Sequence, residues 1–117
     1  MKLNDKIIHN YLTRLGVSPA HKGYECISIA LKLIEEDPRI KMTALYTIIA
    51  KKVDHTASAV ERNIRHAHTR ACNYGDVEFW NTIFGYNVRP YSGTTTNAEF
   101  LKGLYTYITI QEDSANE

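Results

Sequence analysis

Residues 43–74 constrain the fold of this chain more than any other segment, and they read TALYTIIAKKVDHTASAVERNIRHAHTRACNY. Apolar residues recur there at helical spacing on both sides of a polar triplet, Asp54-His55-Thr56. This pattern predicts a helix over about 43–53, a tight turn, and a second helix over about 57–74 that Thr56 can cap. Ala50 and Val60 stand at the spacing of the packing positions of many helix-turn-helix units, although the turn position often held by glycine is Asp54 here. The segment is therefore interpreted as a helix-turn-helix unit.

The second of these helices separates an apolar face from a cationic face. At about 100° per residue, four apolar residues fall on one narrow stripe that we expect to be buried: Val60, Ile64, Ala67 and Ala71. The opposite face carries Ser58, Arg62, Arg65 and Thr69, flanked by Glu61 and His66. Arginine can bond guanine twice, glutamate can accept from cytosine, and hydroxyl groups can bond bases or phosphates. This face is suited to reading bases in a DNA major groove, but it is equally compatible with an ordinary solvated helix surface carrying a Glu61–Arg65 ion pair.

The end of the first helix and the turn add further candidates. Lys51, Lys52, His55 and Thr56 lie where a docked helix-turn-helix unit approaches the sugar-phosphate backbone. We expect these four residues to contact phosphates. The two lysines can at the same time stabilise the C-terminal end of the helix dipole.

The remaining sequence predicts an all-α fold of about six helices. Apolar stripes indicate helices from Leu3 to Leu15 and from about Tyr24 to Asp37, and a short helix capped by Asp76. Ser18-Pro19 is either a cap or a loop, Ser58 with Glu61 offers a capping box that competes with Thr56, and Thr96 with Glu99 predicts a last helix over about 97–109. Residues 85–95 are expected to be an irregular loop. We expect one helical domain over 1–110 and an acidic, disordered tail over 111–117.

Composition excludes several classes of protein. The sequence has no apolar run near the roughly 20 residues of a membrane helix, and two cysteines make no disulfide framework, so we expect a cytoplasmic protein and no membrane partner. His66, His68 and Cys72 could suggest a metal, but no second ligand pair has suitable spacing, so neither a metal nor another cofactor is expected. No enzyme motif is present. The net charge of +1 conceals a basic segment over 51–70 and an acidic end.

Four segments carry a family resemblance: HKGYECISIALKLI, YTIIAKKVDHTASAVERNIRHA, FGYNV and TTNAEFL. In order and spacing they resemble the C-terminal DNA-binding effector domain of the master sporulation transcription factor of endospore-forming bacteria, over about Ile8 to Tyr107. The resemblance implies a six-helix fold whose fourth helix enters the major groove at a box of TGTCGAA type. It also implies tandem binding of two copies, and contact with the sigma subunit of RNA polymerase.

Carried over by position, the resemblance implies that Glu61, Arg62 and Arg65 read base edges, with Ser58 and His66 close to bases or backbone. Two departures stand out. A basic residue of the family corresponds to Ala59 here, which removes one expected phosphate contact. Full-length members also carry a phosphorylatable receiver domain before the effector, whereas this sequence starts almost directly on its first predicted helix, so we expect a stand-alone effector.

Two functions of different kinds remain open at this point. The first is a sequence-specific, double-stranded-DNA-binding transcriptional regulator, acting as a single copy or as a dimer on DNA. The second is a protein-binding modulator that pairs with a full-length family member and blocks its assembly on DNA. A mobility-shift titration separates them, because only the first shifts a duplex that carries the box.

Overall fold

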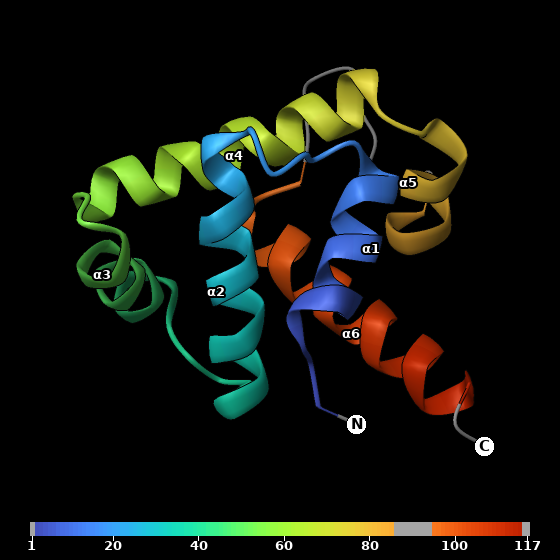
Figure 1. The fold of residues 1–117 in the computed structure, drawn as a ribbon, viewed down its shortest axis with the longest axis horizontal. Coiled ribbons are helices and arrows are strands. Elements are labelled where there is room, and N and C mark those ends of the chain that lie inside the picture. Colours follow the sequence, from blue (N-terminus) through green and yellow to red (C-terminus); the bar gives the residue numbers. More distant parts are fainter. Residues whose placement is uncertain (1, 86–94, 116–117) are drawn as a thin grey trace.

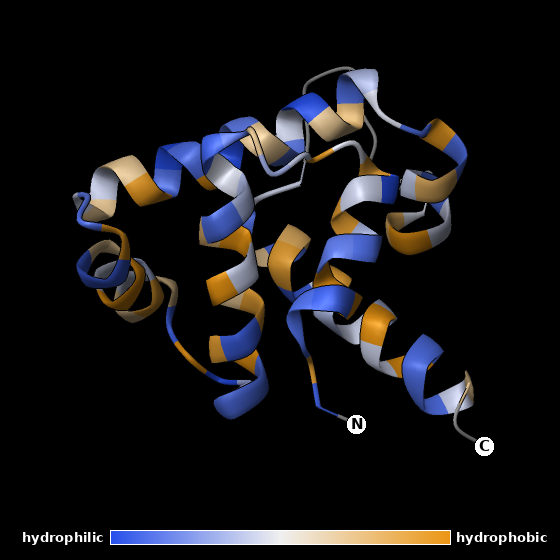
Figure 2. Cartoon of the chain, in the orientation of Figure 1, coloured by the Kyte–Doolittle hydropathy of each residue, from blue (hydrophilic) through white to orange (hydrophobic). Residues whose placement is uncertain are grey.

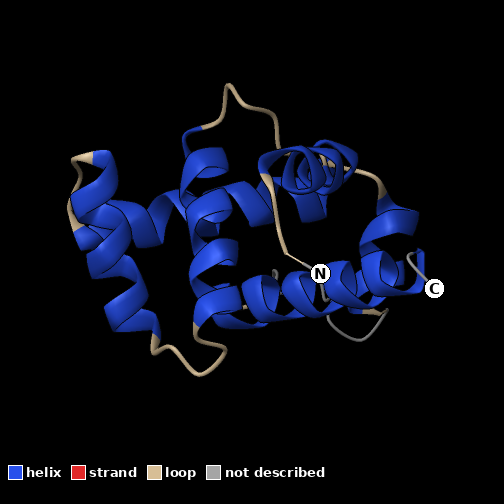
Figure 3. Ribbon diagram, turned by 60° about the horizontal axis from the view of Figure 1, so that its bottom comes forward, coloured by secondary structure: helices blue, strands red, loops and turns tan. Residues whose placement is uncertain are grey.

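A computed structural model describes residues 2–85 and 95–115 of the chain, and these residues form six helices. The helices are α1 (Asp5–Leu15), α2 (Lys22–Glu36), α3 (Met42–Val53), α4 (Ala57–Tyr74), α5 (Val77–Phe84) and α6 (Asn97–Ala115) (Figure 1). Figure 3 shows helices joined by loops, with no strand in the described part of the chain. The predicted all-α class is therefore confirmed. The predicted loop of residues 85–95 lies largely outside the described residues.

The helices pack around one apolar core. The most extensive contact joins α2 and α4, while α3 packs on α4 and α6 contacts α2, α4 and α5. In Figure 1, α4 runs across the N-terminal end of α2. Apolar and polar segments alternate along α4 (Figure 2), as expected for a helix with one buried side. The largest fully buried side chains come from all six helices and include Leu12, Ile27, Leu45, Ile64, Trp80 and Phe100. Trp80 is therefore a core residue.

Local signals placed most helix ends correctly. The Thr56 hydroxyl accepts the Ala59 N–H at 3.0 Å, so Thr56 rather than Ser58 caps α4. The Asp76 carboxylate caps α5 through Phe79 N–H at 3.0 Å. Thr96 and Glu99 form the predicted reciprocal box, because each side chain accepts the other residue's backbone N–H. Ser18-Pro19 lies in a loop, and α2 begins at Lys22.

The end of α6 differs from the prediction. The helix continues to Ala115, beyond the predicted end near Thr109 and through most of the segment expected to be a disordered tail. Long-range contacts explain the extension. The Tyr11 hydroxyl donates to the Glu112 carboxylate at 2.9 Å, and the Tyr107 ring packs edge-on against Tyr11 and Phe79. These contacts outweigh the low helix propensity of residues 106–110, TYITI, four of which are β-branched.

Candidate nucleic-acid interface

The turn between α3 and α4 fixes how the two helices meet. Asp54 ends α3 in the left-handed conformation, with φ 57° and ψ 49°, and the His55 N–H donates to the Ala50 carbonyl at 3.0 Å. Glycine is common at such a position because most side chains disfavour this conformation, whereas aspartate tolerates it better than most. The departure from glycine at Asp54 therefore leaves the turn intact. The two packed helices and their short turn are compatible with a helix-turn-helix unit.

The division of α4 into two faces is present in the structure. Val60, Ile64, Ala67 and Ala71, the predicted stripe, are buried. On the other side Ser58, Arg62, Arg65 and His66 are exposed, and Thr69 and Glu61 are partly exposed. A helix surface with two exposed arginines can enter a groove without unpacking the core, so the geometry leaves the predicted reading face accessible.

A glycine on α2 brings the two helices close together. A methyl group added at Gly23 would lie 2.5 Å from the Asn63 carbonyl oxygen and 2.6 Å from the Ala67 methyl, both on α4. Real β-carbons do not approach so closely, so only glycine allows the observed distance between α2 and α4 at this point. The middle of α4 therefore packs directly against the backbone of α2 at Gly23.

On the exposed face, Glu61 and Arg65 are paired. Arg65 Nε donates to Glu61 Oε2 at 2.9 Å, and Arg65 Nη2 lies 3.4 Å from Glu61 Oε1. The hydrogen bond to Glu61 raises the pKa of the Arg65 guanidinium. The Arg65 side chain remains 50% exposed. Because a guanidinium has five N–H donors, the outer ones stay available to a second acceptor such as guanine.

Glu61 is also hydrogen-bonded by Asn97, a residue that no sequence pattern marked as part of the site. Asn97 Nδ2, at the start of α6, donates to the Glu61 backbone carbonyl at 3.1 Å and to the Tyr46 hydroxyl oxygen at 3.0 Å. The same nitrogen lies 3.4 Å from Glu61 Oε2. Asn97 Oδ1 faces the Nε2 atom of His68 at 2.7 Å. These four residues connect α3, α4 and α6 beneath the exposed face.

His68 is a core residue on the flank of α4. It is 1% exposed, and its ring stacks on Phe100 with 4.9 Å between ring centroids. Burial lowers the pKa of His68, an effect that the hydrogen bond to Asn97 opposes. A neutral imidazole carries no charge to bury, and it can still donate its Nε2–H to the Asn97 amide oxygen. Among the described residues no group of three or more His, Cys, Asp and Glu side chains is placed to hold a metal ion.

The residues predicted to contact phosphates lie at the end of α3 and in the turn that follows it. Lys51 and Lys52 are in the last turn of α3, followed by His55 and Thr56 in the turn, and all four are exposed. His66 lines a shallow hollow formed with His21, Lys22 and Asn63, next to the start of α2. The candidates from α3, the turn and α4 are thus all exposed or partly exposed.

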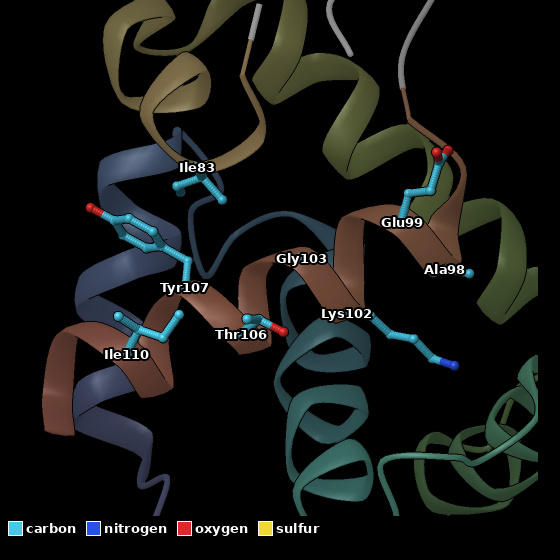
Figure 4. A pocket seen from close by; sticks show the side chains of 8 residues that line it. All are labelled: Ile83, Ala98, Glu99, Lys102, Gly103, Thr106, Tyr107 and Ile110. Atoms are coloured by element: carbon cyan, nitrogen blue, oxygen red, sulfur yellow. The ribbon is translucent and has the colours of Figure 1, made fainter. Parts of the chain in front are cut away.

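A second hollow lies away from α4, between α5 and α6. Figure 4 shows Ile83 on α5 facing Tyr107 and Ile110 on α6, with Glu99 and Lys102 farther along the same helix. Its lining is mainly apolar and contains no nucleophile with a neighbouring base. Separately, none of the helices in the described part of the chain is long and apolar enough to span a bilayer.

Comparison with known protein families gives an independent result. Residues 8–108 match the family model described as "Sporulation initiation factor Spo0A C terminal". The match contains α2 to α5 completely and most of α1 and α6, so it covers the whole proposed interface.

Proposed function

The chain belongs to the family of C-terminal domains of the sporulation initiation factor Spo0A, a family of DNA-binding transcription factor domains, and from this premise we propose how it recognises DNA. Helix α4 enters the major groove with its exposed face toward the bases. Arg62 and Arg65 donate to guanine, and Glu61 accepts from cytosine or aligns Arg65. Ser58, His66 and Thr69 contact bases or backbone, and the preferred box is of TGTCGAA type.

The observation that carries this proposal is the separation of faces on α4. The apolar stripe is buried against the core, while the two arginines are exposed on the other side. The cations and the helix N-terminus at the α3–α4 junction add the second requirement of a groove-binding helix, which is phosphate binding on its flank. Lys51, Lys52, His55 and Thr56 supply these contacts.

Selection of binding sites from random duplexes tests the proposal. We expect one short motif to be enriched, and Arg62→Ala and Arg65→Ala each to weaken binding to it by about 1–3 kcal/mol and to relax base preference. Arg39→Ala is the matched control. It removes the same charge from the loop after α2, at the end of α2 remote from α4 (Figure 1), and should leave binding to the motif nearly unchanged.

Two results would contradict the proposal. One is enrichment of no motif. The other is unchanged affinity of both α4 variants for the motif and for a scrambled duplex. If no duplex shifts at low salt and the chain instead co-elutes with a full-length family member, the protein-binding modulator becomes the better account.

A further inference from the structure

Asn97 is placed so that one amide holds both the backbone and the side chain of Glu61. The distances are 3.1 Å to the Glu61 carbonyl oxygen and 3.4 Å to Glu61 Oε2. An amide nitrogen has two hydrogens, so the Tyr46 hydroxyl oxygen and the Glu61 carbonyl take the two shorter bonds and the carboxylate shares one of them. The Asn97 amide therefore constrains both the backbone position of Glu61 and the direction of its side chain.

The orientation of this amide is determined by its neighbours. If Asn97 were rotated by half a turn, its oxygen would face the carbonyl and carboxylate oxygens of Glu61, and two acceptors would repel each other. The observed orientation places Oδ1 against His68 Nε2 at 2.7 Å, so His68 must donate. His68 is itself fixed by burial and by its stacking on Phe100. The buried His68 ring therefore fixes the orientation of the Asn97 amide.

The constraint continues to the exposed face. Glu61 accepts from Arg65 Nε at 2.9 Å, one helical turn along α4. A path of direct hydrogen bonds thus runs from buried His68 through Asn97 and Glu61 to Arg65. An arginine held in this way loses less side-chain entropy when it binds a base than a free one.

We propose that Asn97 is a positioning residue for base recognition, which presets the Glu61–Arg65 pair from the start of α6 and so determines specificity without touching DNA. The inference rests on the proposed function, because it assumes that the Glu61–Arg65 pair reads bases. It assigns to the first residue of α6 a role that its sequence position, directly after a capping threonine, does not suggest.

A double-mutant cycle tests the inference. The probes are the duplex that the wild-type chain selects from a random pool and a scrambled duplex of equal length. Asn97→Ala should lower the ratio of the two affinities by about tenfold, within the range contributed by one bidentate base contact. Its affinity for the scrambled duplex and its salt dependence should stay as in the wild type, because no phosphate contact is lost. In a Glu61→Ala background, Asn97→Ala should have no further effect on the ratio.

Glu99→Ala is the matched control, because it disrupts the cap of the same helix end without contacting Glu61. It should lower thermal stability while leaving the affinity ratio unchanged. Asn97→Asp is the second variant if Asn97→Ala fails to fold. It keeps the acceptor for His68 and removes the amide N–H donors to Tyr46 and Glu61, and it should lower the ratio as well.

The outcomes separate the two proposals. Equal weakening on both duplexes, or the same loss of ratio in the Glu61→Ala background, would overturn the positioning role and leave Asn97 with a purely structural one. An unchanged ratio in Asn97→Ala, or in Asn97→Asp where that variant carries the test, would overturn it too. If the wild-type chain itself makes no distinction between the duplexes, the proposed function has failed, independently of Asn97.

Discussion

Glu61 and Arg65 form an ion pair on the exposed face of α4, with 2.9 Å between the Glu61 carboxylate oxygen Oε2 and Arg65 Nε. The pair occupies the (i, i+4) spacing that also stabilises ordinary surface helices. What distinguishes it is the support behind Glu61, which the Asn97 amide provides from another helix. The pair is therefore part of the tertiary structure as well as of the helix surface.

Removal of the carboxylate should separate specificity from affinity. Glu61→Ala frees Arg65 and removes a negative charge from the surface that we propose binds DNA. We expect binding to a scrambled duplex to strengthen, while discrimination against single base-pair changes in the selected duplex falls by about 1–3 kcal/mol at one or two positions. Fluorescence anisotropy with a set of single-substitution duplexes measures both effects. Equal discrimination by variant and wild type would exclude Glu61 from base recognition.

The lysines at the end of α3 should act on every sequence alike. Lys51→Ala and Lys52→Ala each remove one proposed phosphate contact, so affinity should fall by a similar factor on selected and scrambled duplexes. The slope of log affinity against log salt should decrease by about one unit for each lysine. Lys6→Ala, on the exposed side of α1, is the control of equal charge. A salt slope unchanged by both α3 variants would show that this end of the unit is not near the backbone.

The close approach of α2 and α4 predicts that Gly23→Ala destabilises the fold, whereas helix propensity alone would predict that it stabilises the fold. Gly23→Ala would gain up to about 1 kcal/mol from helix propensity, but the added methyl overlaps the backbone of α4. We expect a net loss of about 1–3 kcal/mol in the free energy of unfolding, measured by urea denaturation.

Gly103→Ala on α6 is the matched comparison for Gly23→Ala. Among the described residues, its added methyl meets the Phe84 ring at 3.1 Å and no backbone atom. Its loss should be clearly smaller, and an equal loss in the two variants would argue against a tight α2–α4 contact.

Buried His68 predicts an acid-sensitive stability. Burial lowers its pKa below the ordinary 6.5, and nearby Arg65 acts in the same direction, while Asn97 and Glu61 oppose it. The folded state therefore binds fewer protons than the unfolded state below that value. This contribution to stability is complete above about pH 6.5 and is lost as the pH falls toward the folded-state pKa.

Urea denaturation at several pH values between about 7 and 5 checks this, above the range where most carboxylates titrate. His68→Gln keeps an N–H donor for Asn97 but cannot titrate. We expect its stability to change less with pH than that of the wild type. Parallel pH profiles for the two proteins would show that His68 does not couple protonation to folding.

The features that could be predicted from the sequence are local ones. The caps at Thr56 and Asp76, and the buried stripe of α4, follow from neighbours within one or two helical turns. The tie between Asn97 and Glu61 spans 36 residues and the one between Asn97 and His68 spans 29, and no periodicity encodes such contacts. The end of α6 lies beyond the predicted one for the same reason, since the Tyr11 hydroxyl bonds Glu112 from the other end of the chain.

Chemical protection of guanines tests the central claim most directly. Dimethyl sulfate methylates guanine N7, which lies in the major groove, and adenine N3, which lies in the minor groove. With the selected duplex saturated by the wild-type chain, we expect guanine N7 atoms within the motif to be protected. Arg65→Ala, used at a saturating concentration, should restore methylation at one of them. Full methylation of every guanine, with protection of adenine N3 alone, would show that α4 does not lie in the major groove.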